Sequence, residues 1–152
     1  MANPFPFVAS TILEAAQLNG IGEKLTYTPT TTNLTLGNGS LTASYVRVQK
    51  LVYVQIGLVF GSTTLFTGSP SFTLPVTASS SRIGLAATVS MLDSGVAYFL
   101  GGVAISTTTV TPYVSQANGS YLYTDNQNIS ATVPMIWATN DDMRIHFVYE
   151  AA

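Results

Sequence analysis

The sequence predicts an all-β fold, a jelly-roll-like antiparallel β-sandwich that follows an N-terminal arm with one short helix. In residues 51–60 the even positions are Val, Val, Ile, Leu and Phe, whereas the odd positions include Tyr, Gln and Gly. This period-two pattern is typical of a half-buried strand. Turn signals such as Asn118-Gly119 recur about every ten residues, as in sandwiches and jelly rolls.

The arm is predicted to span residues 1–32, and the β-sandwich domain residues 33–152. A short helix is expected over about 11–20, because Thr11 and Glu14 match the capping box at a helix start. A helix of about two turns does not persist alone in water and must dock. It could close one end of its own domain or clasp a neighbouring subunit. The candidate partner contacts of the arm are its large apolar side chains, Phe5, Phe7, Ile12, Leu13, Leu18 and Ile21.

Strands are expected where apolar residues lie between turn signals, beginning after the hairpin-type turn Asn38-Gly39. Before that turn, Thr28–Thr32 is expected to be an extended connector, since Pro29 cannot donate to a ladder. The expected strands are Leu41–Val48, Leu51–Gly61, Ser71–Leu74, Ile83–Leu92, Val96–Ile105, Thr109–Ser115, Ser120–Tyr123, Ile129–Val133, Met135–Ala138 and Met143–Glu150.

The low content of charged residues predicts a subunit of an assembly. Five Lys and Arg and seven Asp and Glu make up 8% of the chain, against roughly 25% in ordinary soluble domains. A folded monomer of this mass exposes roughly 7,400 Å², which leaves roughly 600 Å² of surface for each charge. Monomers seldom expose a single apolar patch larger than about 600 Å². Contact with other chains is therefore expected to cover part of the uncharged surface. We expect a homotrimer.

Several function classes are disfavoured by composition. The few scattered basic residues give no electrostatic footprint for nucleic acid or anionic lipid. The longest apolar runs, Leu51–Phe60 and Val96–Ile105, have half the length that spans a bilayer, so no membrane insertion is expected. The start of the sequence, with Pro4 and Pro6 and no basic residue, does not match a secretory signal. Zero cysteines exclude disulfides, thiolate metal sites and thiol nucleophiles.

No catalytic residue, metal ligand or cofactor site is predicted. His146 is the single histidine and alternates onto one face with Arg144, without a motif that would place a nucleophile beside it. Asp141 and Asp142 are expected to be turn residues that point apart and sit in water, where they cannot act as paired carboxylates. No spacing of acidic residues resembles a calcium loop.

Aromatic side chains are the remaining candidates for ligand binding. Trp137 lies in an apolar stretch, which favours the core or a subunit seam over an exposed sugar platform. Tyr113, Tyr121 and Tyr123 lie nearer to turns and are the better candidates for contact with a host glycan.

Several segments of the chain resemble small β-rich virion proteins of tailed bacteriophages. They are FVASTILEAAQLN (7–19), YTPT (27–30), GNGSLTASYVRV (37–48), SFTLP (71–75), VPMIWATNDD (133–142) and Tyr149-Glu150. The resemblance implies a non-enzymatic, commonly trimeric jelly-roll-like subunit whose N-terminal segment attaches it to the particle. Proteins of this kind serve as capsid decoration (cement) proteins or as fibre and baseplate accessories.

The leading interpretation is a trimeric cement subunit on the surface of the phage particle, bound to the major capsid protein or to other virion proteins. The alternative is a tail fibre or baseplate tip that binds a host-surface glycan. The length of the chain favours the first interpretation, because it has room for one head and one short arm.

Overall fold

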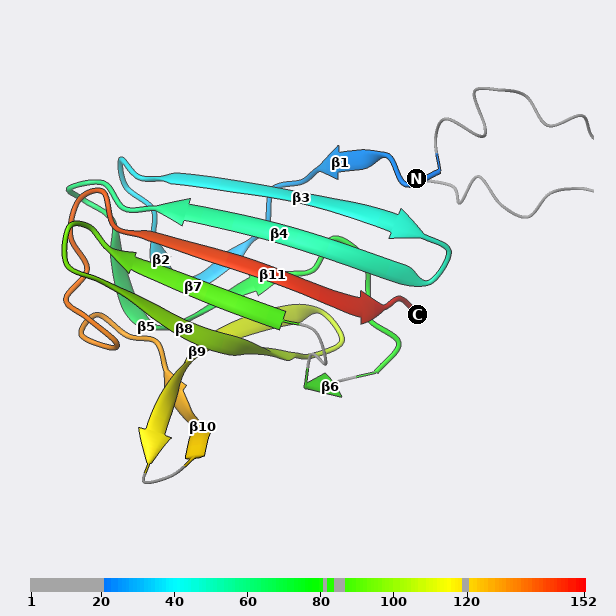
Figure 1. Ribbon diagram of the computed structural model, residues 1–152. Helices are drawn as coiled ribbons and strands as arrows, with labels where there is room; N and C mark the ends of the chain where they lie inside the picture. Colours follow the sequence, from blue (N-terminus) through cyan, green and yellow to red (C-terminus); the bar gives the residue numbers. More distant parts are fainter. Residues whose placement is uncertain (1–20, 81, 84–86, 119–120) are drawn as a thin grey trace, which may run out of the picture.

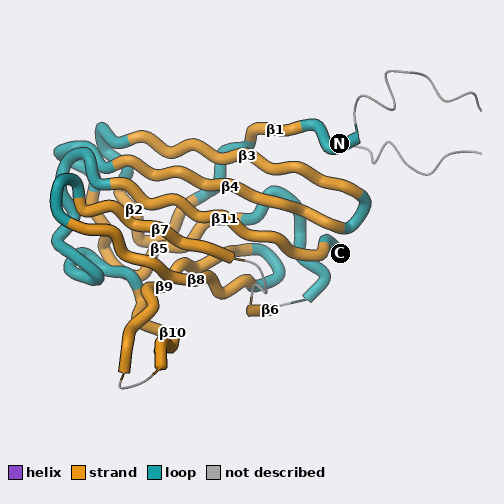
Figure 2. The backbone as a smooth tube through the Cα atoms, in the orientation of Figure 1, coloured by secondary structure: helices purple, strands orange, loops and turns teal. Residues whose placement is uncertain are grey.

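The computed structural model describes residues 21–80, 82–83, 87–118 and 121–152, with the backbone alone for 82–83, 117–118 and 121–127. Within these residues the chain is built from strands and loops, without a helix (Figures 1 and 2). The all-β prediction is therefore confirmed. The helix expected over about 11–20 lies outside the described residues, as do Phe5, Phe7, Ile12, Leu13 and Leu18 of the arm.

The strands form one antiparallel sheet with the order β1-β3-β4-β11-β7-β8-β9-β5-β2, to which β10 adds beside β9 and β6 beside β8. The sheet curls, so that β2 and β5 lie behind β3, β4 and β11 (Figure 1). The strands span β1 Lys24–Thr26, β2 Thr31–Thr35, β3 Ser40–Val48, β4 Leu51–Val59, β5 Leu65–Thr73, β6 Arg82–Ile83, β7 Ala87–Asp93, β8 Ala97–Ile105, β9 Thr109–Asn118, β10 Tyr121–Asn128 and β11 Asp142–Glu150.

The core lies inside the curl and is built by the alternate residues that the sequence pattern marks. On β4, the even positions from Val52 to Leu58 are at most 2% exposed. The next strand in the sheet, β11, contributes Met143, Ile145 and Phe147, all fully buried. Because successive side chains of a strand point to opposite faces, the other half of each strand forms the outer surface.

Residues 129–138 are not strands, and the prediction of strands at Ile129–Val133 and Met135–Ala138 is wrong. In this segment, Ser130 and Val133 form one isolated β-bridge, and the other residues have no β-type pairing. Its apolar residues instead anchor a loop, because Ile129 and Met135 are buried and the ring of Trp137 stacks on Phe60 with centroids 4.7 Å apart. Apolar residues in a covering loop give the same sequence signal as a strand.

The turn at Asn38-Gly39 is present, but it does not form the expected hairpin. It joins β2 to β3, which pair with different strands. The Asn38 side chain instead binds the loop after β4, where its Oδ1 accepts hydrogen bonds from the Thr63 amide and hydroxyl, both at 2.9 Å. The turn therefore fastens one loop to another at the same end of the sheet.

The sheet also includes segments that the sequence pattern assigned elsewhere. β1 lies within the predicted arm, and β2 begins at Thr31 within the predicted connector. β5 runs from Leu65 to Thr73 and is longer than expected, with Pro70 inside it. Where one strand was expected from Ile83 to Leu92, β6 and β7 are separated by residues outside the described part.

Candidate functional site on the outer sheet face

The strands β3, β4, β11, β7 and β8 expose one continuous face, here called the outer face. Cross-strand pairs align its residues in rows, so that Ser44, Gln55 and His146 lie side by side on β3, β4 and β11. The outer face comprises Ser40, Thr42, Ser44, Val46, Val48, Leu51, Tyr53, Gln55, Gly57, Val59, Thr88, Ser90, Leu92, Tyr98, Leu100, Asp142, Arg144, His146, Val148 and Glu150. Its charged residues are Asp142, Arg144 and Glu150, so most of the face is polar without charge or apolar.

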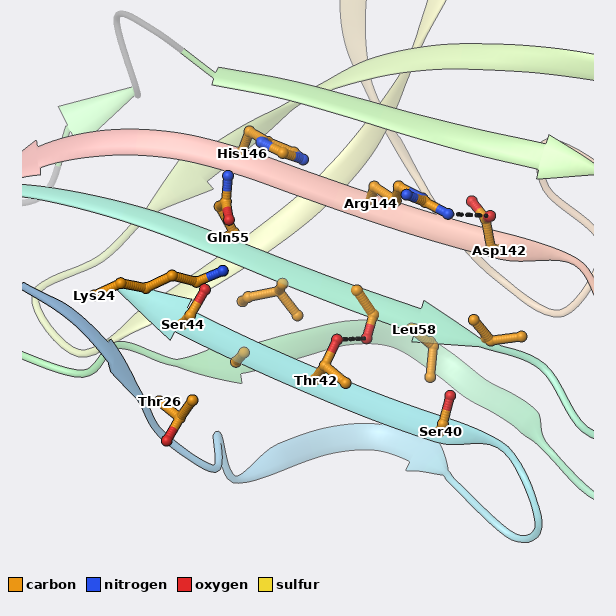
Figure 3. A pocket seen from close by; sticks show the side chains of 14 residues that line it. Lys24, Thr26, Ser40, Thr42, Ser44, Gln55, Leu58, Asp142, Arg144 and His146 are labelled. Carbon is orange, nitrogen blue, oxygen red and sulfur yellow. Dashed lines mark hydrogen bonds and ion pairs between the residues drawn. The ribbon is translucent and has the colours of Figure 1, made fainter. Parts of the chain in front are cut away.

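A shallow groove of about 580 Å³ crosses the middle of the outer face between β1, β3, β4 and β11 (Figure 3). Its walls include hydroxyl, amide and charged groups from Lys24, Thr42, Ser44, Gln55, Arg144 and His146. Gly57 lines the groove and carries no side chain, so the groove is open at this position. These groups can donate and accept hydrogen bonds to a polar ligand or a polar protein surface.

A hydrogen-bonded chain on β4 and β11 holds the groove's histidine in place. Gln55 Nε2 donates to the Tyr53 hydroxyl at 2.8 Å, and that hydroxyl lies 3.0 Å from His146 Nδ1. The Tyr53 hydroxyl thus lies between the Gln55 amide and the imidazole ring of His146. His146 is half-buried and faces away from the core, as the alternation predicts.

The two adjacent aspartates have different environments, and one of them corrects a prediction. Asp141 is not a solvated turn residue, because it is 1% exposed and its carboxylate accepts from the amides of Ser94 at 2.9 Å and Ala138 at 2.6 Å. Asp141 thereby fastens the loop before β11 to the turn between β7 and β8. Asp142 is partly exposed and pairs with Arg144 at 3.2 Å. The two carboxylates thus have separate partners.

The β8 end of the outer face is apolar and exposed. Tyr98 and Leu100 of β8 are 75% and 60% exposed, and Val96, in the turn just before β8, is 78% exposed. Tyr98 lies opposite Leu92 on β7, and Val59 on β4, 40% exposed, continues the apolar row beyond Asp142. Large apolar side chains gathered on one face are common at contact surfaces, so this part of the outer face is a candidate for one.

The aromatic candidates from the sequence occupy different places. Tyr113 is 8% exposed and its ring lies close to Gly102 of β8. Tyr121 and Tyr123 belong to β10, in a hairpin with β9 that projects from the body of the sheet (Figure 1). Trp137 packs against the core, as predicted, and its Nε1–H donates to the Ser130 carbonyl at 3.0 Å. Ile21 of the arm is 41% exposed just before β1.

Sequence reasoning did not identify Tyr98 and Leu100 as surface residues. In the sequence they belong to the apolar run Val96–Ile105, which is compatible with a fully buried strand. Only the register with β7 places them outside, opposite Leu92 and Ser90. The alternation of β7 itself was a usable signal, because its outward positions include Thr88 and Ser90.

Comparison of the chain with protein-family models, with curated proteins and with solved structures gives no match. The described residues contain no cluster of three or more His, Asp or Glu that could hold a metal ion. Nor does the described part of the chain contain a helix long and apolar enough to cross a membrane.

Proposed function

We propose that the chain is a non-enzymatic structural subunit on the surface of a tailed-bacteriophage particle. As a capsid decoration or cement protein, it acts as a homotrimer and binds the major capsid protein or other virion proteins. The observation that carries the proposal is the exposed apolar row Val96, Tyr98 and Leu100 on a chain with 8% charged residues. A protein that remained a monomer would leave this row in water.

The size of the apolar row indicates how much of the outer face an assembly must cover. Full burial of a large apolar side chain contributes roughly 2 kcal/mol relative to full exposure, so covering the exposed 60–78% of Val96, Tyr98 and Leu100 contributes roughly 4 kcal/mol in all. Association costs about 4–15 kcal/mol in lost freedom of motion. The row alone therefore barely offsets that cost, and a stable interface must extend over neighbouring parts of the outer face.

The finer architecture and the arm belong to the same proposal. We take the curled sheet as a jelly-roll-like sandwich, since β2 and β5 lie behind β3, β4 and β11 with buried side chains between them (Figure 1). The arm, residues 1–32 in the sequence analysis, is proposed to attach the subunit to the particle. Its described apolar residue Ile21 is exposed and available for such a contact.

A second candidate function is a fibre or baseplate tip that binds a host glycan. The projection of the β9–β10 hairpin, which carries Tyr121 and Tyr123, favours it (Figure 1). Tyr113 is buried at the base of that hairpin, which disfavours it as a glycan contact. Localisation on the particle surface is common to both candidates.

The experiment that separates the two uses particles that lack the subunit. For a cement protein, such particles break open at lower temperature or milder osmotic stress, because a ligand that binds only the assembled shell stabilises it. Adding back the purified protein restores stability, whereas protein without residues 1–22 does not. Particles that stay robust but adsorb poorly to host cells would contradict the cement function and support glycan binding.

A further inference from the structure

Strand β9 leaves the sheet partway along β8. The two strands pair from Ile105 opposite Val110 to Gly101 opposite Val114. Beyond Val114, β9 continues to Asn118 in a hairpin with β10, which projects away from the body (Figure 1). Residues Ala97–Leu100 of β8 therefore lose β9 as a neighbour while they still pair with β7 on their other side.

The glycine pair of β8 explains where β9 departs. A Cβ atom on Gly101 would overlap the carbonyl of Tyr113, and one on Gly102 would press on the Tyr113 ring at 3.1 Å. Glycine at both positions allows the backbone of β9 to pass close to β8 at the point where the two strands separate. The two glycines thus mark the place on β8 where the pairing with β9 ends.

The result is an open sheet edge. Among the described residues, no strand pairs with the β9 side of Ala97–Leu100. Native proteins protect exposed edges with charged residues, proline or bulges. The stretch Val96–Gly101 contains no charged residue and no proline, and its side chains Tyr98 and Leu100 are exposed. An edge of this kind is suited to accept a further strand.

We propose that this edge binds β10 of a second copy of the chain. The donor is present in the same molecule: β10 pairs with β9 on one side, and among the described residues no strand pairs with its other side. β10 also projects from the body, where a neighbour can reach it (Figure 1). Asp125 is the single charged residue of the β10 sequence, so charge does not oppose the pairing.

The proposed contact is head to tail, because the acceptor on β8 and the donor on β10 are different surfaces of one chain. Contacts of this type form closed rings when the rotation between neighbours closes. Three copies joined in this way would each use one edge and one hairpin, and the added strand would lie beside Tyr98 and Leu100 and cover part of them. This inference rests on the trimer of the proposed function and names the surfaces that hold it together.

Cysteine cross-linking tests the pairing directly, since the chain has no cysteine of its own. Protein carrying Leu100→Cys is mixed with protein carrying one cysteine in β10, with each position from 121 to 128 tested in turn. We expect a disulfide-linked pair of unlike chains for at least one β10 position. Ile136→Cys, a matched control at a loop residue that is 78% exposed, should give no such pair.

Light scattering gives an independent test. The wild-type protein should have about three chain masses, and the double variant Tyr98→Lys, Leu100→Lys about one, with an unchanged circular dichroism spectrum. Ile136→Lys should leave the trimer intact. A wild-type monomer would overturn the inference.

Two further outcomes would also overturn the inference. If the variant with both lysines is still a trimer and no cross-link forms, the edge pairing is wrong. The proposed function is not affected by this result, because the particle assay tests it separately. Monomers caused by the lysines without any cross-link would mean that the edge binds an element other than β10, and this too would overturn the inference.

Discussion

The carboxylate of Asp141 accepts a hydrogen bond from the backbone amide of Ser94, 2.9 Å away and 47 residues earlier in the chain. Its other oxygen accepts from Ala138, and the backbone of Asp141 accepts from the amide of Phe60 at the end of β4. The buried side chain thus joins the β7–β8 turn to the loop before β11, and the backbone of the same residue binds the end of β4. This junction holds the end of the sheet from which the exposed β8 residues begin.

Replacing Asp141 by alanine should lower the free energy of unfolding by about 3 kcal/mol, because two backbone amides lose the buried carboxylate that accepts their hydrogen bonds. Asp142→Ala is the matched control. It removes an ion pair with an Arg144 side chain that is 63% exposed, and such pairs contribute about 0–1 kcal/mol. Urea unfolding of the two variants measures the difference. Equal losses would show that Asp141 does not hold the junction.

Tyr149, which is buried, and Tyr27, which is partly buried against the core, should respond differently to loss of the hydroxyl. The Tyr149 hydroxyl donates to the Val76 carbonyl at 2.7 Å, so Tyr149→Phe should cost about 1 kcal/mol of unfolding free energy. The Tyr27 hydroxyl is buried and has no hydrogen-bond partner among the described residues. Tyr27→Phe should therefore be neutral or stabilising. Thermal unfolding checks the order, and a larger loss for Tyr27→Phe would contradict these environments.

Stability should fall in alkaline solution through the same residues. Burial raises the pKa of Tyr149 to about 12, and it also raises the pKa of Tyr27 above its ordinary value. Between pH 10 and about 12 the unfolded chain releases these protons while the folded chain keeps them, so the unfolding free energy decreases as pH rises. Below pH 10 the contribution is complete.

Urea unfolding between about pH 9 and pH 11 measures this decrease. Tyr149→Phe should reduce the slope, whereas Tyr98→Phe, at a residue that is 75% exposed, should not. A slope that is the same in the wild type and in Tyr149→Phe would rule out a contribution from Tyr149.

Gly101 should be intolerant of any side chain. Gly101→Ala places a Cβ against the backbone carbonyl of Tyr113, which cannot move without shifting β9, so we expect a loss of at least about 2 kcal/mol. Gly57→Ala on the outer face is the control, because its Cβ would meet only the Thr42 hydroxyl at 3.1 Å, a side chain that can rotate. Similar unfolding midpoints for the two variants would refute the close passage of β9 over β8.

Local patterns in the sequence predict much of the sheet. The alternation of β4 and β11 correctly identifies the buried faces from Val52 to Leu58 and from Met143 to Tyr149, because each strand has one face on the core. The region around Trp137 is misread for a physical reason. A loop that packs Met135 and Trp137 into the core has the apolar content of a strand without its backbone pairing.

The outer face could not be predicted in the same way. Tyr98 and Leu100 lie in an apolar run, and only the register of β8 with β7 places them on the outer face, a relationship between strands. The burial of Asp141 likewise depends on Ser94, which adjoins it only in the folded chain. The low charge of the outer face could be predicted, because the number of charged residues is known from the sequence without the strand pairing.

Imaging of the intact particle tests the central claim most directly. At a resolution that separates strands, the curled sheet should fit repeated density on the outside of the shell, grouped in threes, with β8 and β10 of neighbouring copies in contact. The account would be contradicted if the protein were found inside the particle, were absent from it, or occurred only as single copies at the tail tip.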